Sequence, residues 1–177
     1  MSVLALATAG CGKSRVHREA SAENNGVYVS AGPITYQLEV SRELNQYSAE
    51  DSQYLAGVPR ATSSLQPNQL WYGVFLWAMN QNKVAERTSS DFVIEDTQGN
   101  RYYPIEVSRA SNPYMWISQM LNPGGIEPGP DTTASFGPTQ GGLLLFKLNT
   151  SVYDNRPLTL EILGPSRRVL GAISLDL

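Results

Sequence analysis

The sequence predicts an all-β protein, an antiparallel β-sandwich of about eight or nine short strands with one short helix. Three observations support this fold class. Charged residues make up only 16% of the chain, while 15 Gly and 11 Pro residues supply many turns. Apolar and polar residues alternate with the period of two that a half-buried strand requires. Turn residues also recur about every ten residues, which is typical of a sandwich.

The composition bounds the organisation and the chemistry of the chain. A length of 177 residues fits one domain, which we place at 27–177, after an N-terminal segment 1–26. The net charge of −3, without a run of Lys or Arg, argues against a nucleic-acid partner. One cysteine and one histidine exclude an intrachain disulfide and argue against a Cys/His metal site, so we expect no metal and no cofactor. Nothing in the sequence indicates an oligomeric state.

The N-terminal segment 1–26 predicts a lipoprotein signal followed by a polar tether. A short apolar run leads to the small residues Ala9 and Gly10, and Cys11 then occupies the position that becomes lipidated in such signals. The match has two departures, because no Lys or Arg precedes the short apolar run and Thr8 stands where Leu is usual. This motif predicts an extracytoplasmic protein attached to the membrane through a lipid on Cys11.

A phosphate-binding loop is a competing interpretation of the same residues. The stretch Ala7–Ser14 matches a loosened Walker A pattern in which Lys13 would contact phosphate. Such a loop belongs to a parallel sheet, which requires helices between its strands, and the chain lacks helix-length amphipathic segments. The apolar run ending at Phe146 also leads into Lys147 rather than into an Asp for magnesium. We therefore prefer the lipoprotein signal; a terminus without function is the third alternative.

The first strands are predicted at 27–31 and 34–41. In the second, apolar residues alternate strictly with polar ones, which indicates one buried and one wet face. The polar stretch 45–68 is too long for a hairpin loop. It fits a surface excursion with local helix or a functional loop, but we prefer a crossover between two sheets.

The stretch 70–79 predicts the central strand of the fold. Both of its faces are apolar, so it should be covered on both sides. A strand at 91–95, a tight turn in which Gly99 takes a positive φ, and a strand at 101–107 should follow. The residues of these two strands expected to point inward are Phe92, Ile94, Tyr103, Ile105 and Val107.

One helix of two to three turns is predicted within 111–128, because four apolar residues there recur at helical spacing. These residues are Tyr114, Ile117, Met120 and Leu121. Tyr114 and Trp116 could form the lip of a ligand site, although we prefer that they plug the open end of the core. The remaining strands are predicted at 131–136, 143–148, 158–162 and 169–175.

Three segments carry a resemblance to a known family: Asp91–Pro104, Gly141–Lys147 and Arg156–Ile162. Together with the central aromatic strand, they resemble the immunoglobulin-like domain of unknown function in many extracytoplasmic bacterial lipoproteins, whose relatives include secreted immunogenic proteins of mycobacteria. The resemblance covers about 27–177 and concerns strand order and turn placement. It implies an immunoglobulin-like antiparallel sandwich outside the cytoplasm, and the family offers no catalytic residues to transfer.

The favoured function is non-enzymatic binding of an envelope protein, glycan or small ligand through the loops 45–69 and 109–130. The binding residues that we expect in these loops are the aromatic side chains of Tyr47, Tyr54, Tyr114 and Trp116. The alternative is a carbohydrate-processing or hydrolase accessory domain that uses loop carboxylates.

Several residues could carry chemistry, but each has a simpler interpretation. The carboxylate pairs Glu50/Asp51 and Glu95/Asp96 are sequence neighbours, which point to opposite faces of a strand. A calcium site could use Asp91, Asp96 and Asn100, without the spacing of a known loop. His17 lies in the predicted tether, away from any nucleophile. Asn149 begins a formal glycosylation sequence that we give little weight in a bacterial chain.

Overall fold

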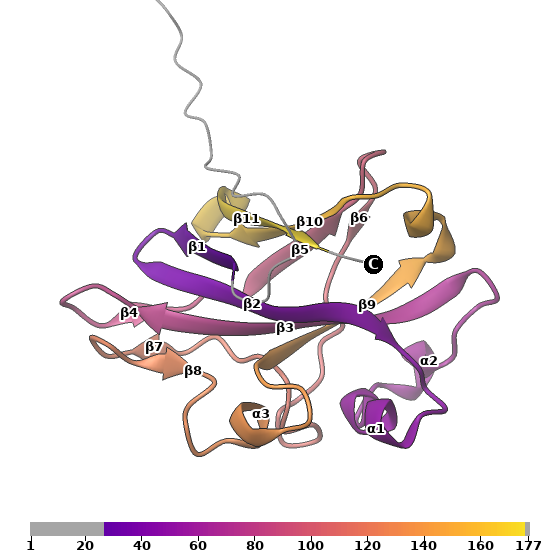
Figure 1. Ribbon diagram of the computed structural model, residues 1–177, viewed down its shortest axis with the longest axis horizontal. Helices are drawn as coiled ribbons and strands as arrows, with labels where there is room; N and C mark the ends of the chain where they lie inside the picture. Colours follow the sequence, from indigo (N-terminus) through magenta and orange to yellow (C-terminus); the bar gives the residue numbers. More distant parts are fainter. Residues whose placement is uncertain (1–26, 176–177) are drawn as a thin grey trace, which may run out of the picture.

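A computed structural model describes residues 27–175 as an all-β sandwich of two antiparallel sheets, which confirms the predicted fold class (Figure 1). The five-stranded sheet has the order β1-β2-β3-β8, and β9 pairs with β3. Its strands are β1 (Val27–Ala31), β2 (Ile34–Leu44), β3 (Gln69–Asn80), β8 (Ile126–Glu127) and β9 (Gly142–Asn149). The four-stranded sheet contains, in order, β11 (Val169–Leu175), β10 (Leu158–Leu163), β5 (Asp91–Glu95) and β6 (Arg101–Tyr102). A short ribbon pairs β4 (Glu86–Arg87) with β7 (Met120–Leu121).

The two longest strands, β2 and β3, pair with each other in the five-stranded sheet. Their register joins Ile34 to Asn80 at one end and Leu44 to Trp71 at the other. Since the chain returns to the same sheet, the predicted crossover between sheets at 45–68 is wrong. The segment is a surface excursion with local helix, made of α1 (Ala49–Ser52), a 3-10 turn (Gln53–Leu55) and α2 (Arg60–Ser63).

Strand β3 lies in the middle of the structure, and both of its faces are buried as predicted. One face joins the core between the two sheets, and the other joins a second core on the outer face of the five-stranded sheet. The residues that β3 gives to the first core are Leu70, Tyr72, Val74, Leu76 and Ala78. Those that it gives to the second are Trp71 and Phe75.

A third layer, which is not a sheet, covers the second core. Figure 1 shows α1, α2 and α3 (Thr133–Phe136) on the side of the β2–β3–β9 sheet opposite to β5, β10 and β11. Tyr54 is fully buried in this layer, and its ring lies 5.0 Å from that of Phe75 and 4.9 Å from that of Tyr114. The side chain of Asn112 donates to the carbonyls of Tyr54 and Ala56, 2.8 Å and 3.2 Å away, so it ties two loops together.

The β5–β6 hairpin shows why the predicted strand 101–107 ends early. Gly99 has φ +81°, as predicted for the turn. Strand pairing joins Ile94 to Tyr102, and continuing that register would place Pro104 opposite Phe92. Proline has no N–H to donate to a ladder, so β6 stops after Tyr102 and the chain leaves this sheet.

Because the chain leaves this sheet after Tyr102, the side chains that point inward differ from those predicted for a strand at 101–107. Tyr102 is buried and Tyr103 is 51% exposed, so the inward assignment of Tyr103 is wrong. Ile105 and Val107 are partly buried and pack against the second core, on the far side of the five-stranded sheet. Phe92 and Ile94 do point into the core between the sheets.

Two other predicted elements are also wrong. The helix predicted around 114–121 is an extended segment that ends in β7, and its apolar residues do not share one face. Tyr114 enters the second core, Leu121 enters the first, and Met120 is exposed. The strand predicted at 131–136 contains the helical turn α3. No helix within residues 27–175 is long and apolar enough to cross a membrane.

The carboxylate of Asp96 is predicted to stabilise the fold in a pH-dependent way. It is buried and accepts hydrogen bonds from the backbone of Gln98 and from Asn100 and Asn155. Burial opposes ionisation, but these bonds outweigh it and lower the pKa of Asp96. Stability from the ionised group is therefore present above the unfolded value of about 4 and lost as pH falls through the folded pKa.

We expect Asp96→Asn to lower the free energy of unfolding by about 1–3 kcal/mol at neutral pH. The difference from wild type should shrink at about pH 3, because that pH lies below the unfolded value of about 4 and the stability from the ionised carboxyl is progressively lost there. Urea unfolding at the two pH values measures both effects. Asp154→Asn, at an exposed residue, is the matched control and should unfold like wild type at both pH values. An equal loss of unfolding free energy for Asp96→Asn at both pH values would contradict the prediction.

Candidate functional site

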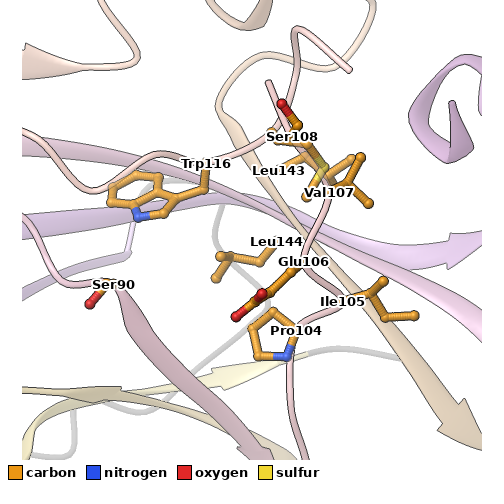
Figure 2. A pocket seen from close by; sticks show the side chains of 10 residues that line it. Ser90, Pro104, Ile105, Glu106, Val107, Ser108, Trp116, Leu143 and Leu144 are labelled. Carbon is orange, nitrogen blue, oxygen red and sulfur yellow. The ribbon is translucent and has the colours of Figure 1, made fainter. Parts of the chain in front are cut away.

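A solvent-open groove lies where the chain passes from the four-stranded sheet to β9. Its volume is about 470 Å³, which falls within the range of small-molecule sites. Figure 2 shows the Trp116 ring on one side, the Glu106 carboxylate and Pro104 on the other, and Leu144 between them. The lining residues are Ser90, Pro104, Ile105, Glu106, Val107, Ser108, Met115, Trp116, Leu143 and Leu144.

Two loop segments dock on the same edge of β9 and leave the groove between them. The backbone N–H of Ile105 donates to the carbonyl of Leu145 at 2.7 Å. Further along the strand, the N–H of Trp116 donates to the carbonyl of Leu143 at 2.9 Å. The N–H of Leu143 in turn donates to the backbone carbonyl of Tyr114 at 2.8 Å. These bonds partly cover an edge strand that would otherwise offer its polar groups to other chains.

The Trp116 side chain is fixed by contacts on its core side. Its indole Nε1 donates to the carbonyl of Ser89 at 2.9 Å, and its ring lies 5.9 Å from Tyr36 and 5.6 Å from Phe92. Gly142 allows the close approach of the indole, since a Cβ there would lie 2.8 Å from Trp116 Cε3. The wall of the groove is thus a rigid aromatic surface.

A neighbouring cavity of about 370 Å³ shares Ser90 with the groove and is lined by more charged residues. The fully buried Tyr36 lines this cavity. The Tyr36 hydroxyl accepts a 2.6 Å hydrogen bond from the N–H of Ser89. Burial raises the pKa of Tyr36 to about 12, while this hydrogen bond acts in the opposite direction. The charged residues that line this cavity are Glu86, Arg87 and Asp91.

The loop between these cavities and β8 is held by a buried ion pair. Arg109 Nη1 lies 3.2 Å from Glu127 Oε1, and Gln119 donates to the other carboxylate oxygen. Glu127 is fully buried. Burial raises the pKa of this carboxyl, and Arg109 and Gln119 offset the effect only in part. Because Arg109 directly follows Ser108, the pair also positions one end of the groove.

The structure separates the four aromatic residues predicted for binding. Tyr54 and Tyr114 are 0% and 9% exposed and pack together in the second core. Trp116 lines the groove. Tyr47 is 88% exposed and lines a different hollow, with Glu43 and Leu65. These residues therefore do not form one binding surface.

The carboxylates considered for chemistry have structural partners. Asp51 accepts from Arg42 at 2.6 Å and from the N–H of Asn45 at 2.8 Å. Burial would raise the pKa of Asp51, but these partners lower it overall. Neither Glu50/Asp51 nor Glu95/Asp96 lines any of the three cavities above.

The proposed calcium ligands are not brought together by the structure. Asp91 and Asp96 flank β5 at opposite ends, although Asp96 and Asn100 do meet in the hairpin turn. Within residues 27–175, no group of three side chains that could hold a metal ion occurs. Cys11, His17 and the Walker-like stretch 7–14 lie outside the described residues.

Sequence reasoning missed the groove residues Glu106, Ser90 and Leu144. They come from three separate segments, and no motif joins them. The one available signal was Glu106, a carboxylate flanked by Ile105 and Val107.

The two packed antiparallel sheets place the protein in the class of all-β sandwiches. A known structure with a similar fold supports this class. The yjhA protein from Bacillus subtilis has a similar fold, with a TM-score of 0.53 and 11% identity over 85% of this chain and 97% of that chain. The ycdA protein from Bacillus subtilis, a candidate lipoprotein by its description, gives a TM-score of 0.49 and 10% identity over 87% of this chain and 39% of that one.

A beta-sandwich protein from Clostridium difficile gives a TM-score of 0.41 and 9% identity over 85% of this chain and 91% of its own. No protein-family model matches the chain, and no curated protein matches it. At 11% identity, the similarity to the yjhA protein shows the fold alone.

Replacing Tyr54 is predicted to destabilise the loop layer, because the residue fills the centre of the second core. We expect Tyr54→Ala to lower the free energy of unfolding by about 3–5 kcal/mol. Tyr47→Ala removes the same side chain from an exposed position and should change it by less than about 0.5 kcal/mol. Urea denaturation compares the two variants, and equal losses would show that Tyr54 does not support the layer.

Proposed function

We propose that the protein is an extracytoplasmic, lipid-anchored, non-enzymatic binding domain whose ligand site is the groove beside Trp116. The anchor rests on the sequence Ala9-Gly10-Cys11, which precedes a polar segment and then the sandwich that starts at Val27. A lipid on Cys11 would hold the domain at the membrane surface, and a second attachment signal would make that binding stable. The resemblance to immunoglobulin-like lipoprotein domains supports the same placement.

The groove is the observation that carries the binding role. It combines a fixed aromatic wall with an apolar floor and a few polar groups, which is the usual composition of a ligand site. Its lining contains a single carboxylate, Glu106, whereas glycoside hydrolysis ordinarily needs two. Binding without chemistry therefore fits the groove best.

Lipid attachment is tested on the full-length protein expressed in a bacterial host with its native upstream region. We expect a mature chain that begins at Cys11, carries lipid mass and fractionates with the membrane. Cys11→Ala should abolish the lipid mass, whereas Lys13→Ala should leave processing unchanged. An unprocessed wild-type chain that binds nucleotide through Lys13 would instead support the phosphate-loop alternative.

The carbohydrate-processing alternative has one observation in its favour, the two carboxylates in the cavity beside Tyr36. Glu86 is half-buried and Asp91 is exposed, whereas a general acid at neutral pH is usually more shielded from water. We expect no release of chromophore from nitrophenyl glycosides by the wild-type protein. Turnover that Glu86→Gln and Asp91→Asn each abolish would establish the alternative.

A further inference from the structure

The groove beside Trp116 is lined by one charged residue, and most of its other lining residues are apolar. Of its ten lining residues, Glu106 is the only one with an ionisable side chain, and Ser90 and Ser108 provide the hydroxyls. We propose that this groove recognises an aliphatic cation, a primary ammonium or guanidinium group on an alkyl chain. The proposal rests on the ligand-binding role proposed above and names the chemistry of the ligand.

The charge of Glu106 is not neutralised within the described part of the protein. Its side chain is exposed and makes no hydrogen bond or ion pair with residues 27–175. Some other carboxylates of the fold do have an arginine partner: Asp51 pairs with Arg42, Glu127 with Arg109, and Glu161 with Arg101. A ligand in the groove would have to bring the positive charge itself.

Arg109 is the basic residue that lies next to the groove residues in the sequence. It directly follows the groove residue Ser108, but its guanidinium is bound to the buried Glu127 and does not line the groove. Removing Arg109 from that pair would leave the buried carboxylate without its positive partner, which is strongly destabilising. The groove therefore offers no positive group to an anionic ligand.

Apolar side chains line the groove next to the Glu106 carboxylate. Leu144 forms the floor between Glu106 and the Trp116 ring, as Figure 2 shows. An alkyl stem can pack on such a floor while its charged end reaches the carboxylate, as Lys and Arg side chains do on protein surfaces. An indole ring at the same site can add cation–π attraction. A short-chain amine or one basic side chain matches this combination.

The experiment follows the indole N–H resonance of Trp116 during titration of the full-length, ¹⁵N-labelled protein. The probes are n-pentylammonium chloride and the peptide acetyl-Ala-Lys-Ala-amide. Their uncharged counterparts, n-pentanol and the same peptide with norleucine, keep the shape and remove the charge. Trp116→Phe assigns the resonance among the three tryptophans of the chain.

We expect the charged probes to shift the Trp116 resonance and to bind about fivefold or more tightly than their neutral counterparts. Glu106→Gln should remove that difference, whereas the matched control Asp154→Asn should retain it. Higher salt should weaken the charged probes alone. Binding of both charged probes shows that a free alkyl amine suffices, and binding of the peptide alone assigns the site to a basic side chain of a partner protein.

Equal binding of charged and neutral probes, or no effect of Glu106→Gln, would show that the groove does not recognise a cation. The proposed function, ligand binding in this groove, would then still stand. Absence of any shift at Trp116 would overturn both the cation site and the groove as a ligand site. Lipid attachment at Cys11 is measured separately, so its failure does not bear on this result.

Discussion

The burial of both faces of β3 is the constraint on which the rest of the structure depends. Successive side chains of a strand point to opposite sides, so a strand that is apolar throughout needs a packing partner on each side. The four-stranded sheet covers the face that carries Tyr72, Val74 and Leu76. The face that carries Trp71 and Phe75 has no second sheet, and the loop layer covers it instead. The long connections of the chain are therefore part of its core.

A loop layer over a core has to satisfy its own backbone groups, because buried N–H and C=O groups need partners. Asn112 provides two of these bonds from its side-chain amide, and its oxygen accepts from the N–H of Tyr114. The hydroxyl of Tyr54 accepts from the N–H of Thr139, and Lys147 donates to the carbonyls of Thr62 and Ser64. Side-chain hydrogen bonds thus satisfy backbone groups of the loop layer, as backbone hydrogen bonds between strands do elsewhere in the fold.

Local patterns predicted the strands well wherever a strand has a neighbour on each side. The alternation in β2, the two apolar faces of β3 and the hairpin turn at Gly99 all follow from period and turn chemistry. The edge strands β1, β9 and β11 also lie where they were predicted, and the failures concern the loop layer and the short strands β4, β6, β7 and β8. Tyr114 and Leu121 have helical spacing, but they enter different cores, and their segment follows the edge of β9 through long-range hydrogen bonds. Such contacts leave no periodic trace in one sequence.

The groove could not be predicted for a related reason. It exists because Pro104 ends the pairing of β6 and the chain then crosses to β9, where Ile105 binds Leu145. The crossing carries Glu106 to a position facing Trp116, which is held by Ser89 and by the space above Gly142. A residue that reads as one outward position of a strand becomes the single charge of an apolar groove. The missing N–H of Pro104 therefore both shortens one sheet and leads the chain to the groove.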